Sequence, residues 1–307
     1  MVDSLKTLKT VFLSSSVGGL TGKILGTLMP SFCFQAVMSK QEGYGPFCTI
    51  SFDCDFPRDI KSIPKVLELL KRHDVLASFA CVGQWIRRFP DEHRLIVDAG
   101  CEMLNHTETH PNLFHPDYDY ACGEGLSKER FNEISFERRQ EEIFRGHETF
   151  IEVLGIEPSG FRAPHFGALH KEDVYPLLGK LSYSYSSSTV ASSSPSYGLP
   201  YLTTGSIWEF PLSPCPRHPF GVFDSWHALG KHGATHSASG DLSHLFKELC
   251  ENVLRTGGYA NVYFDPYDLL HSGELERILE YVKSTQLEVI GYEKLISKIS
   301  RKTPVFV

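Results

Sequence analysis

Residues 47–56 read FCTISFDCDF. The first part of this stretch, 47–53, is a β-rich run that predicts a short strand. Asp53 ends this run and Asp55 follows two positions later. Two carboxylates at the end of an apolar strand are costly to place near a core unless something compensates them. The stretch therefore predicts a strand that ends either in a turn capped by one carboxylate, or in a site where one carboxylate binds a cation and the other does acid/base work.

Downstream of this strand, the sequence alternates helix-like and strand-like segments. Apolar residues at helical spacing predict helices at 60–74, 89–100, 134–155, near 170–180, 242–258 and 273–284. Short apolar or β-rich runs predict strands at 76–83, 101–106, 160–164, within 182–198, 206–213 and 259–265, and 287–299 predicts a final strand and helix. This alternation predicts a parallel sheet with helices outside it.

Polar residues cluster at the ends of the predicted strands. Such positions are held by Asp53, Asp55, His106, Arg162 and Asp265. In α/β barrels, the carboxyl ends of the strands form the active-site face. In a doubly wound sheet, polar residues would gather only near one switch point. Because several strands contribute polar residues, the pattern favours the barrel.

The composition argues against some classes of protein. The formal net charge of −7 argues against a general nucleic-acid binder, which presents a basic face. A hydrophobic content of 41% and a charged content of 22% are those of an ordinary soluble globular protein. Because the 8 cysteines follow no CxxC pattern, we expect reduced thiols in a cytoplasmic protein rather than disulfides or a zinc–thiolate cluster.

Residues 1–45 are predicted to form an N-terminal extension to a catalytic domain that spans 46–307. The start of the chain lacks the charge pattern and cleavage site of a signal peptide. Lys23, several glycines and Pro30 interrupt the apolar segment 11–38, whereas a membrane span needs about 20 predominantly apolar residues. Two interpretations stay open: an arm that packs on its own domain or on another subunit of a homo-oligomer, and an interfacial helix that contacts a membrane.

The segment MLNHTETHPNLF (103–114) places His106 and His110 four residues apart. A catalytic zinc site has three protein ligands and an open position for water. One aspartate and two neutral imidazoles meet that count, and a bound cation lowers the pKa of water towards about 7. The histidines are also compatible with a hydrogen-bonded loop in which Asn105 and Thr107 are the partners. The spacing alone leaves both interpretations open.

Four segments resemble the polysaccharide deacetylase family, the NodB-homology domain of carbohydrate esterase family four. SFDCDF (51–56) resembles the first motif of the family in its D-x-D branch, and GFRAPHFG (160–167) resembles the R-x-P motif. PDEHRLIVDAGCEMLNHTETHPNL (90–113) resembles the helix that leads into the H-[ST]-x-x-H motif, and KVLELLKRHDVLASFACVG (65–83) resembles the preceding helix and strand. The resemblance runs from about residue 47 to residue 300 and implies a distorted (β/α) barrel.

The resemblance also implies a role for each matching residue. Asp53 would be the general base, and Arg162 would hold the base carboxylate and favour its ionised form. The metal ligands would be Asp55, His106 and His110. The cation would be foremost Zn²⁺, with Co²⁺, Ni²⁺ and Mn²⁺ as alternatives.

Four further residues are predicted to lie near the substrate. Thr107 would brace the histidine loop, and Trp208 in SIWEFPLS (206–213) would help to line the groove. His165, beside the R-x-P motif, is predicted to be a pocket-wall residue. Trp226 is a candidate for stacking on a sugar ring.

The general acid is where the sequence departs from the family. The D-x-D branch carries a histidine in an H-P-W-E-like stretch at the last catalytic strand, whereas VYFDPYDLLH (262–271) has Asp265 there. A carboxylic acid can protonate a leaving amine only if its pKa is raised. His271 and His227 are the alternative proton donors.

Together these roles imply metal-dependent hydrolysis of a carbon–nitrogen bond in a non-peptide amide, foremost N-deacetylation of an amino sugar in a polysaccharide or its precursor. The expected substrate is an N-acylated sugar linked to a nucleotide or a lipid. The expected location of the protein is the cytoplasm or the inner face of the membrane. Two alternatives stay open. One is a deformylase or a cyclic amide or imide hydrolase of the same fold, and the other is a carbohydrate-binding relative that has lost catalysis.

Overall fold

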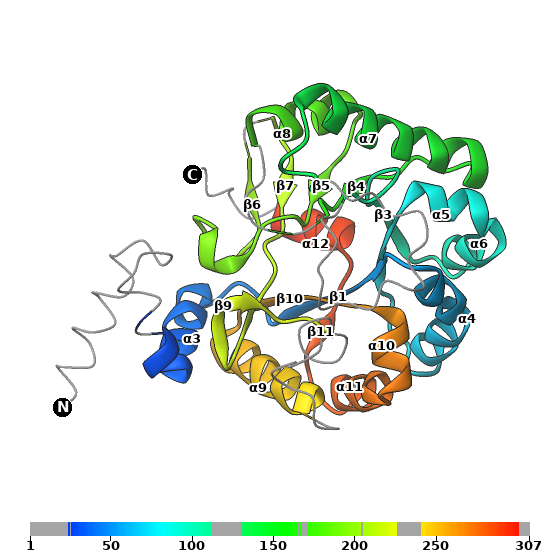
Figure 1. The fold of residues 1–307 in the computed structure, drawn as a ribbon. Coiled ribbons are helices and arrows are strands. Elements are labelled where there is room, and N and C mark those ends of the chain that lie inside the picture. The colour runs from blue at the N-terminus through cyan, green and yellow to red at the C-terminus, as the bar shows by residue number, and fades with distance from the viewer. Residues whose placement is uncertain are drawn as a thin grey trace, which may run out of the picture.

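The computed structural model describes residues 24, 26–111, 130–164, 166, 171–203, 205–225 and 241–300. Its centre is a curled, mostly parallel sheet that forms a half-barrel, with the strand order β10-β1-β2-β3-β4-β5-β7-β6 and with β11 paired to β1 (Figure 1). The one antiparallel pair in this order is β6 with β7. The strands are β1 (Phe47–Cys54), β2 (Ser78–Cys81), β3 (Glu102–Asn105), β4 (Gly160–Phe161), β5 (Tyr185–Ser186), β6 (Tyr201–Leu202), β7 (Trp208–Glu209), β10 (Tyr259–Phe264) and β11 (Glu288–Val289).

Helices cover the outside of this sheet (Figure 1). They are α3 (Pro30–Met38), α4 (Pro57–Arg72), α5 (Gly83–Arg88), α6 (Pro90–Asp98), α7 (Phe136–Thr149), α8 (Lys171–Lys180), α9 (Asp241–Thr256), α10 (Pro266–His271) and α11 (Glu274–Lys283). Helix α12 (Tyr292–Ile299) lies on the inner side of the half-barrel instead, where it packs in one cluster with Ala80, Leu104 and Tyr185 (Figure 1). Short 3-10 turns lie at Ser39–Gln41 and Ala191–Ser193, and a π-helical turn at Phe150–Leu154 extends α7. A separate antiparallel pair joins β8 (Pro214–Cys215) to β9 (His218–Val222).

Strand β1 shows why the sheet is buried on both faces. Its apolar residues Cys48, Ile50, Phe52 and Cys54 belong to the main core cluster, together with the apolar faces of the covering helices. Successive side chains of a strand point to opposite faces, so the intervening Thr49, Ser51 and Asp53 point into the half-barrel. These polar residues are also buried. The inside of the half-barrel at β1 is therefore polar.

The predicted α/β barrel is confirmed in the form of this half-barrel. The predicted helices at 60–74, 134–155 and 273–284 correspond to α4, α7 with its π-helical turn, and α11, with ends that differ by a few residues. The short helix α10 was not predicted. It follows directly after β10, and six residues are too few to show a helical period.

Part of the predicted N-terminal extension packs on the body of the protein. Phe34 and Met38 of α3 belong to the main core cluster. The Gln41 side chain donates from Nε2 to the Tyr197 carbonyl and accepts from the Tyr259 amide through Oε1. The domain boundary at 45–46 stays a prediction, and residues 1–23 lie outside the described residues. Within the described part of the chain, no helix is both long and apolar enough to cross a bilayer.

Candidate metal and catalytic centre

The three predicted metal ligands lie together at the carboxyl ends of β1 and β3. Nε2 of His106 is 3.3 Å from Oδ1 of Asp55, and Nε2 of His110 is 3.4 Å from Oδ2 of the same carboxylate. One ligand atom from each residue lies within 4.8 Å of the other two. Ligand atoms bound tetrahedrally to a zinc ion are about 3.4 Å apart, so the spacing and the donor set both fit Zn²⁺.

The orientation of His106 is fixed from behind the ring. Its Nδ1 lies 2.7 Å from the carbonyl oxygen of Arg162, so an Nδ1–H group donates to that carbonyl and Nε2 faces Asp55. Burial lowers the pKa of His106, but the carboxylates of Asp55 and Asp53 and the hydrogen bond to the Arg162 carbonyl together raise it, and the net pKa is raised. Because a protonated imidazole cannot bind a metal, a cation at this site competes with a proton.

The histidine loop is held in an unusual backbone conformation. Thr107 and His110 have φ angles of 68° and 51°, a left-handed region that residues other than glycine seldom adopt. The Thr107 hydroxyl donates to the His106 carbonyl (2.5 Å) and accepts from the His110 amide (3.1 Å). The Thr107 amide donates to Oδ1 of Asn105 at 2.9 Å. These bonds stabilise the loop that directs both imidazoles at Asp55.

Helix α7 supports the histidine loop from outside. The Glu142 carboxylate accepts from both the amide and the hydroxyl of Thr109 at 2.8 Å, and the Glu142 carbonyl accepts from the Glu108 amide. Gly146 lets the helix approach closely, because a Cβ there would lie 2.4 Å from Oδ1 of Asn105. A side chain at this position would therefore displace the loop.

Trp85 is a contributor that the sequence analysis missed. It lies on α5, directly after β2, and its indole Nε1 donates to the carbonyl oxygen of Asp55 at 2.8 Å. This bond fixes the backbone of Asp55, the predicted metal ligand that directly follows β1. From the sequence alone, a tryptophan at this position is expected to be a core residue. The contact with Asp55 is therefore visible only in the folded structure.

The predicted general base Asp53 forms a buried ion pair with Arg162. Nη1 of Arg162 donates to Oδ1 of Asp53 at 2.5 Å, and the side chains are 0% and 3% exposed. Oδ2 of Asp53 lies 3.9 Å from Nε2 of His106, which places the carboxylate beside the ligand set. Burial raises the pKa of Asp53, and the Arg162 guanidinium opposes that rise.

The Asp265 carboxyl group is also buried. The Ser225 hydroxyl donates to its Oδ2 at 3.1 Å and accepts from the Asp265 amide at 2.5 Å. Burial raises the pKa of Asp265 well above its usual range, and the nearby carboxylates of Asp268 and Asp59 raise it further. This is the environment that a carboxyl group needs in order to stay protonated near neutral pH.

Two aromatic rings that the sequence analysis missed lie beside Arg162. The rings of Phe166 and Tyr263 are 4.7 Å apart between centroids. The Arg162 guanidinium carbon lies 5.7 Å from the first ring and 5.6 Å from the second. Tyr263 lies in β10, and Asp265 directly follows the end of this strand.

The remaining predicted residues are placed as follows. Trp208 is partly buried against the core cluster that contains Tyr185, Phe210 and Tyr292, and its role at the groove stays a prediction. His271 is exposed on α10, and its ring stacks on that of Tyr267 with centroids 3.8 Å apart. His165, Trp226 and His227 lie outside the described residues.

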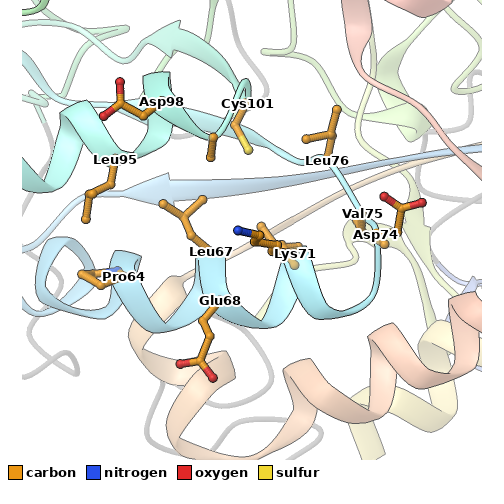
Figure 2. Close-up of a pocket in the computed structure, with 12 residues that line it drawn as sticks. Pro64, Leu67, Glu68, Lys71, Asp74, Val75, Leu76, Leu95, Asp98 and Cys101 are labelled. Carbon is orange, nitrogen blue, oxygen red and sulfur yellow. The ribbon is translucent and has the colours of Figure 1, made fainter.

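A groove on the outside of the protein is separate from this centre (Figure 2). It lies between α4 and α6, and its lining includes Leu67, Lys71, Asp74, Leu76 and Leu95. Asp74 and Leu76 precede β2, whereas the metal ligands follow the carboxyl ends of their strands. None of the predicted site residues lines the groove.

The half-barrel brings together an Asp/His/His group that could hold a divalent cation and a buried aspartate–arginine pair. Residues 42–185 match the family model described as polysaccharide deacetylase. This part of the chain is therefore similar to the polysaccharide deacetylase family.

Two curated relatives are similar to parts of the chain. The peptidoglycan-N-acetylglucosamine deacetylase of Bacillus cereus is 35% identical over 135 residues, which cover 44% of this chain and 40% of the relative. A chitooligosaccharide deacetylase of a Bradyrhizobium species is 36% identical over 76 residues, which cover 25% of this chain and 28% of the relative. The chain thus spans less than half the length of these relatives.

Solved structures show the same fold at low sequence identity. A Mycobacterium smegmatis protein assigned to the polysaccharide deacetylases has a TM-score of 0.64 and 19% identity, over 85% of this chain and 93% of that one. A peptidoglycan deacetylase of Bacillus subtilis has a TM-score of 0.52 and 12% identity, over 86% and 95%. A pseudoenzyme of carbohydrate esterase family four from Bacillus anthracis has a TM-score of 0.50 and 16% identity, over 82% and 66%.

Proposed function

We propose that the protein is a metal-dependent amidohydrolase that removes the acyl group from the nitrogen of an N-acylated amino sugar. One observation carries the proposal. A ligand set for a divalent cation lies beside a buried aspartate–arginine pair, at the ends of parallel strands. Buried carboxylates and imidazoles in such a cluster cost free energy of folding, and function is the usual reason that they persist.

In this proposal, Asp53 activates the attacking water beside a bound cation. The chemistry that a cation bound at Asp55, His106 and His110 supplies is Lewis acidity, which polarises an amide carbonyl and lowers the pKa of water. Asp53 accepts the proton that the water gives up as its oxygen attacks the carbonyl carbon. Arg162 holds the Asp53 carboxylate through one oxygen and leaves the other directed towards the ligand set.

Asp265 serves as the proton donor in this proposal. Its raised pKa keeps a proton on the carboxyl group, and the Ser225 hydroxyl fixes its orientation. When the carbon–nitrogen bond breaks, that proton passes to the departing amine, and the products are a carboxylate and a free amino sugar. A proton donor is needed because an amine anion is a poor leaving group.

The substrate class follows from the named relatives. They are a peptidoglycan-N-acetylglucosamine deacetylase and a chitooligosaccharide deacetylase, so an N-acetylated sugar of the glucosamine type is the first candidate. Sugars linked to a nucleotide or a lipid are the forms that we propose. The cytoplasmic location and the contact of residues 1–45 with a membrane stay predictions.

A release assay tests the proposed function. Acetate and formate are measured after incubation with N-acylated sugar nucleotides, lipid-linked sugars and chitin oligomers, with EDTA and after Zn²⁺ is restored. We expect acetate release that EDTA abolishes and Zn²⁺ restores. Formate release instead would favour the deformylase alternative. If neither acetate nor formate is released from any of these substrates, the protein does not hydrolyse these acyl groups and the proposal is wrong.

A second candidate is a carbohydrate-binding protein without catalysis. It is favoured by Asp265 at the position where the family branch carries a histidine, and by the fold shared with a pseudoenzyme. Equilibrium binding of chitin oligomers, measured on the same preparation, separates the two. Binding without acetate release would identify a binding protein.

A further inference from the structure

A closed ring of hydrogen bonds lies on the inner side of Arg162. Its Nη2 donates to the Tyr292 hydroxyl (2.9 Å) and to the Ser187 hydroxyl (3.0 Å). The Tyr292 hydroxyl donates to Oδ1 of Asn261 at 2.8 Å, and Nδ2 of Asn261 donates to the Ser187 hydroxyl at 3.0 Å. All four side chains are fully buried.

We infer that Tyr292 is a positioning residue, which acts through Arg162 to hold Asp53 in its reactive orientation. The inference rests on the proposed function. The guanidinium group of Arg162 contacts the general base and the hydrogen-bonded ring at the same time. Nη1 donates to Asp53, Nε donates to the Ser187 carbonyl, and Nη2 donates to the hydroxyls of Ser187 and Tyr292. Because the guanidinium group is planar and rigid, fixing Nε and Nη2 also fixes the direction of Nη1.

Tyr292 is itself held firmly at the first position of α12. Its amide donates to Oε2 of Glu102 at 2.8 Å, so a carboxylate from the start of β3 caps the helix. Its ring packs against those of Tyr185 and Phe210, with centroids 4.8 and 5.0 Å away. The hydroxyl therefore reaches Arg162 from a rigid support, as the positioning of a catalytic group requires.

Tyr259 provides a matched control in the same cluster. It is also fully buried, and its ring contacts Phe210 at 6.2 Å between centroids. Its hydroxyl donates to the Thr49 hydroxyl at 2.9 Å, and the Thr49 hydroxyl in turn donates to the Ile290 carbonyl. Tyr259→Phe thus removes one buried hydroxyl without touching the ring of bonds at Arg162.

The experiment compares Tyr292→Phe with Tyr259→Phe in the full chain loaded with Zn²⁺. We expect Tyr292→Phe to lower kcat by about tenfold or more, since small errors in the placement of a reacting group cost large factors in rate. KM and the affinity for Zn²⁺, measured by competition with a chelator, should stay within about twofold. Tyr259→Phe should change the melting temperature to a similar extent but leave kcat within about twofold. Equal kcat values for the two variants would overturn the inference.

A second readout does not depend on turnover. In ¹⁵N-labelled protein, hydrogen exchange at Nε–H of Arg162 reports how firmly the guanidinium is held, and we expect exchange about tenfold faster in Tyr292→Phe. If Tyr292→Phe does not fold, Ser187→Ala removes the other acceptor of Nη2 and should give the same changes in kcat and exchange. Wild-type protein that releases no acetate would refute the proposed function alone. Unchanged exchange at Arg162 would refute the positioning role alone.

Discussion

Arg162→Met removes the guanidinium group and leaves the Asp53 carboxylate buried without its cation. The two side chains are 0% and 3% exposed, so solvent can replace little of the lost interaction. Breaking a buried ion pair by removing one partner costs about 3–5 kcal/mol. We therefore expect the free energy of unfolding to fall by about that amount where Asp53 is ionised, and turnover to fall with it.

The loss should depend on pH in a defined direction. The pKa of Asp53 in the folded protein is raised by burial and held down by Arg162, so it rises further in the variant. A group whose folded pKa exceeds its unfolded pKa contributes stability at low pH, and this contribution is lost as the pH rises through the folded pKa. The variant should therefore be penalised more at pH 8 than at pH 5.

Urea unfolding of the metal-free proteins at both pH values measures this penalty. Arg139→Met is the matched control, because Arg139 pairs with Asp173 away from the site and these side chains are 9% and 18% exposed. Because this pair is more exposed, we expect Arg139→Met to lower the free energy of unfolding by only about 1–2 kcal/mol. A loss below about 1 kcal/mol for Arg162→Met at pH 8, or an equal loss at both pH values, would refute the reasoning.

Three further predictions concern the same centre. Asp53→Asn should retain Zn²⁺ but lose about a hundredfold or more in turnover, whereas His106→Ala should lose both, and metal analysis of the purified variants beside the acetate assay checks this. Asp265→Asn should lower turnover yet raise the free energy of unfolding at pH 7. Burial raises the pKa of the Asp265 carboxyl group, so the folded protein must hold a proton that the unfolded chain releases at this pH, and the neutral amide of asparagine avoids this cost; no gain in a urea titration would contradict the burial argument. Trp85→Phe should weaken Zn²⁺ binding by about fivefold in a chelator competition, because one hydrogen bond to the Asp55 carbonyl is worth about 1 kcal/mol.

The sequence could predict those parts of the site whose residues lie close together in the chain. Asp53 and Asp55 lie two residues apart at the end of one predicted strand, so the strand prediction alone places them close together. His106 and His110 belong to a single loop whose partners, Asn105 and Thr107, lie within the same few residues. Short-range patterns carry this kind of information directly.

The supports of the site could not be predicted, because they depend on contacts between distant segments. Trp85 reaches Asp55 only after β2 has paired with β1. Tyr292 lies 130 residues after Arg162 in the chain. Nothing in the sequence indicates which polar group its hydroxyl contacts. No spacing rule links such residues, so their partners follow from the packed fold.

The pairing of β1 with β10 has a consequence for the newly synthesised protein. β1 carries Asp53, but its parallel partner β10 begins at Tyr259, late in the chain. While the ribosome is still translating the intervening residues, one long edge of β1 has no strand to bind, and an unpaired apolar edge promotes aggregation. Nascent chains that end before residue 259 should therefore depend on chaperones, and the aspartate half of the centre should mature only after β10 has been synthesised.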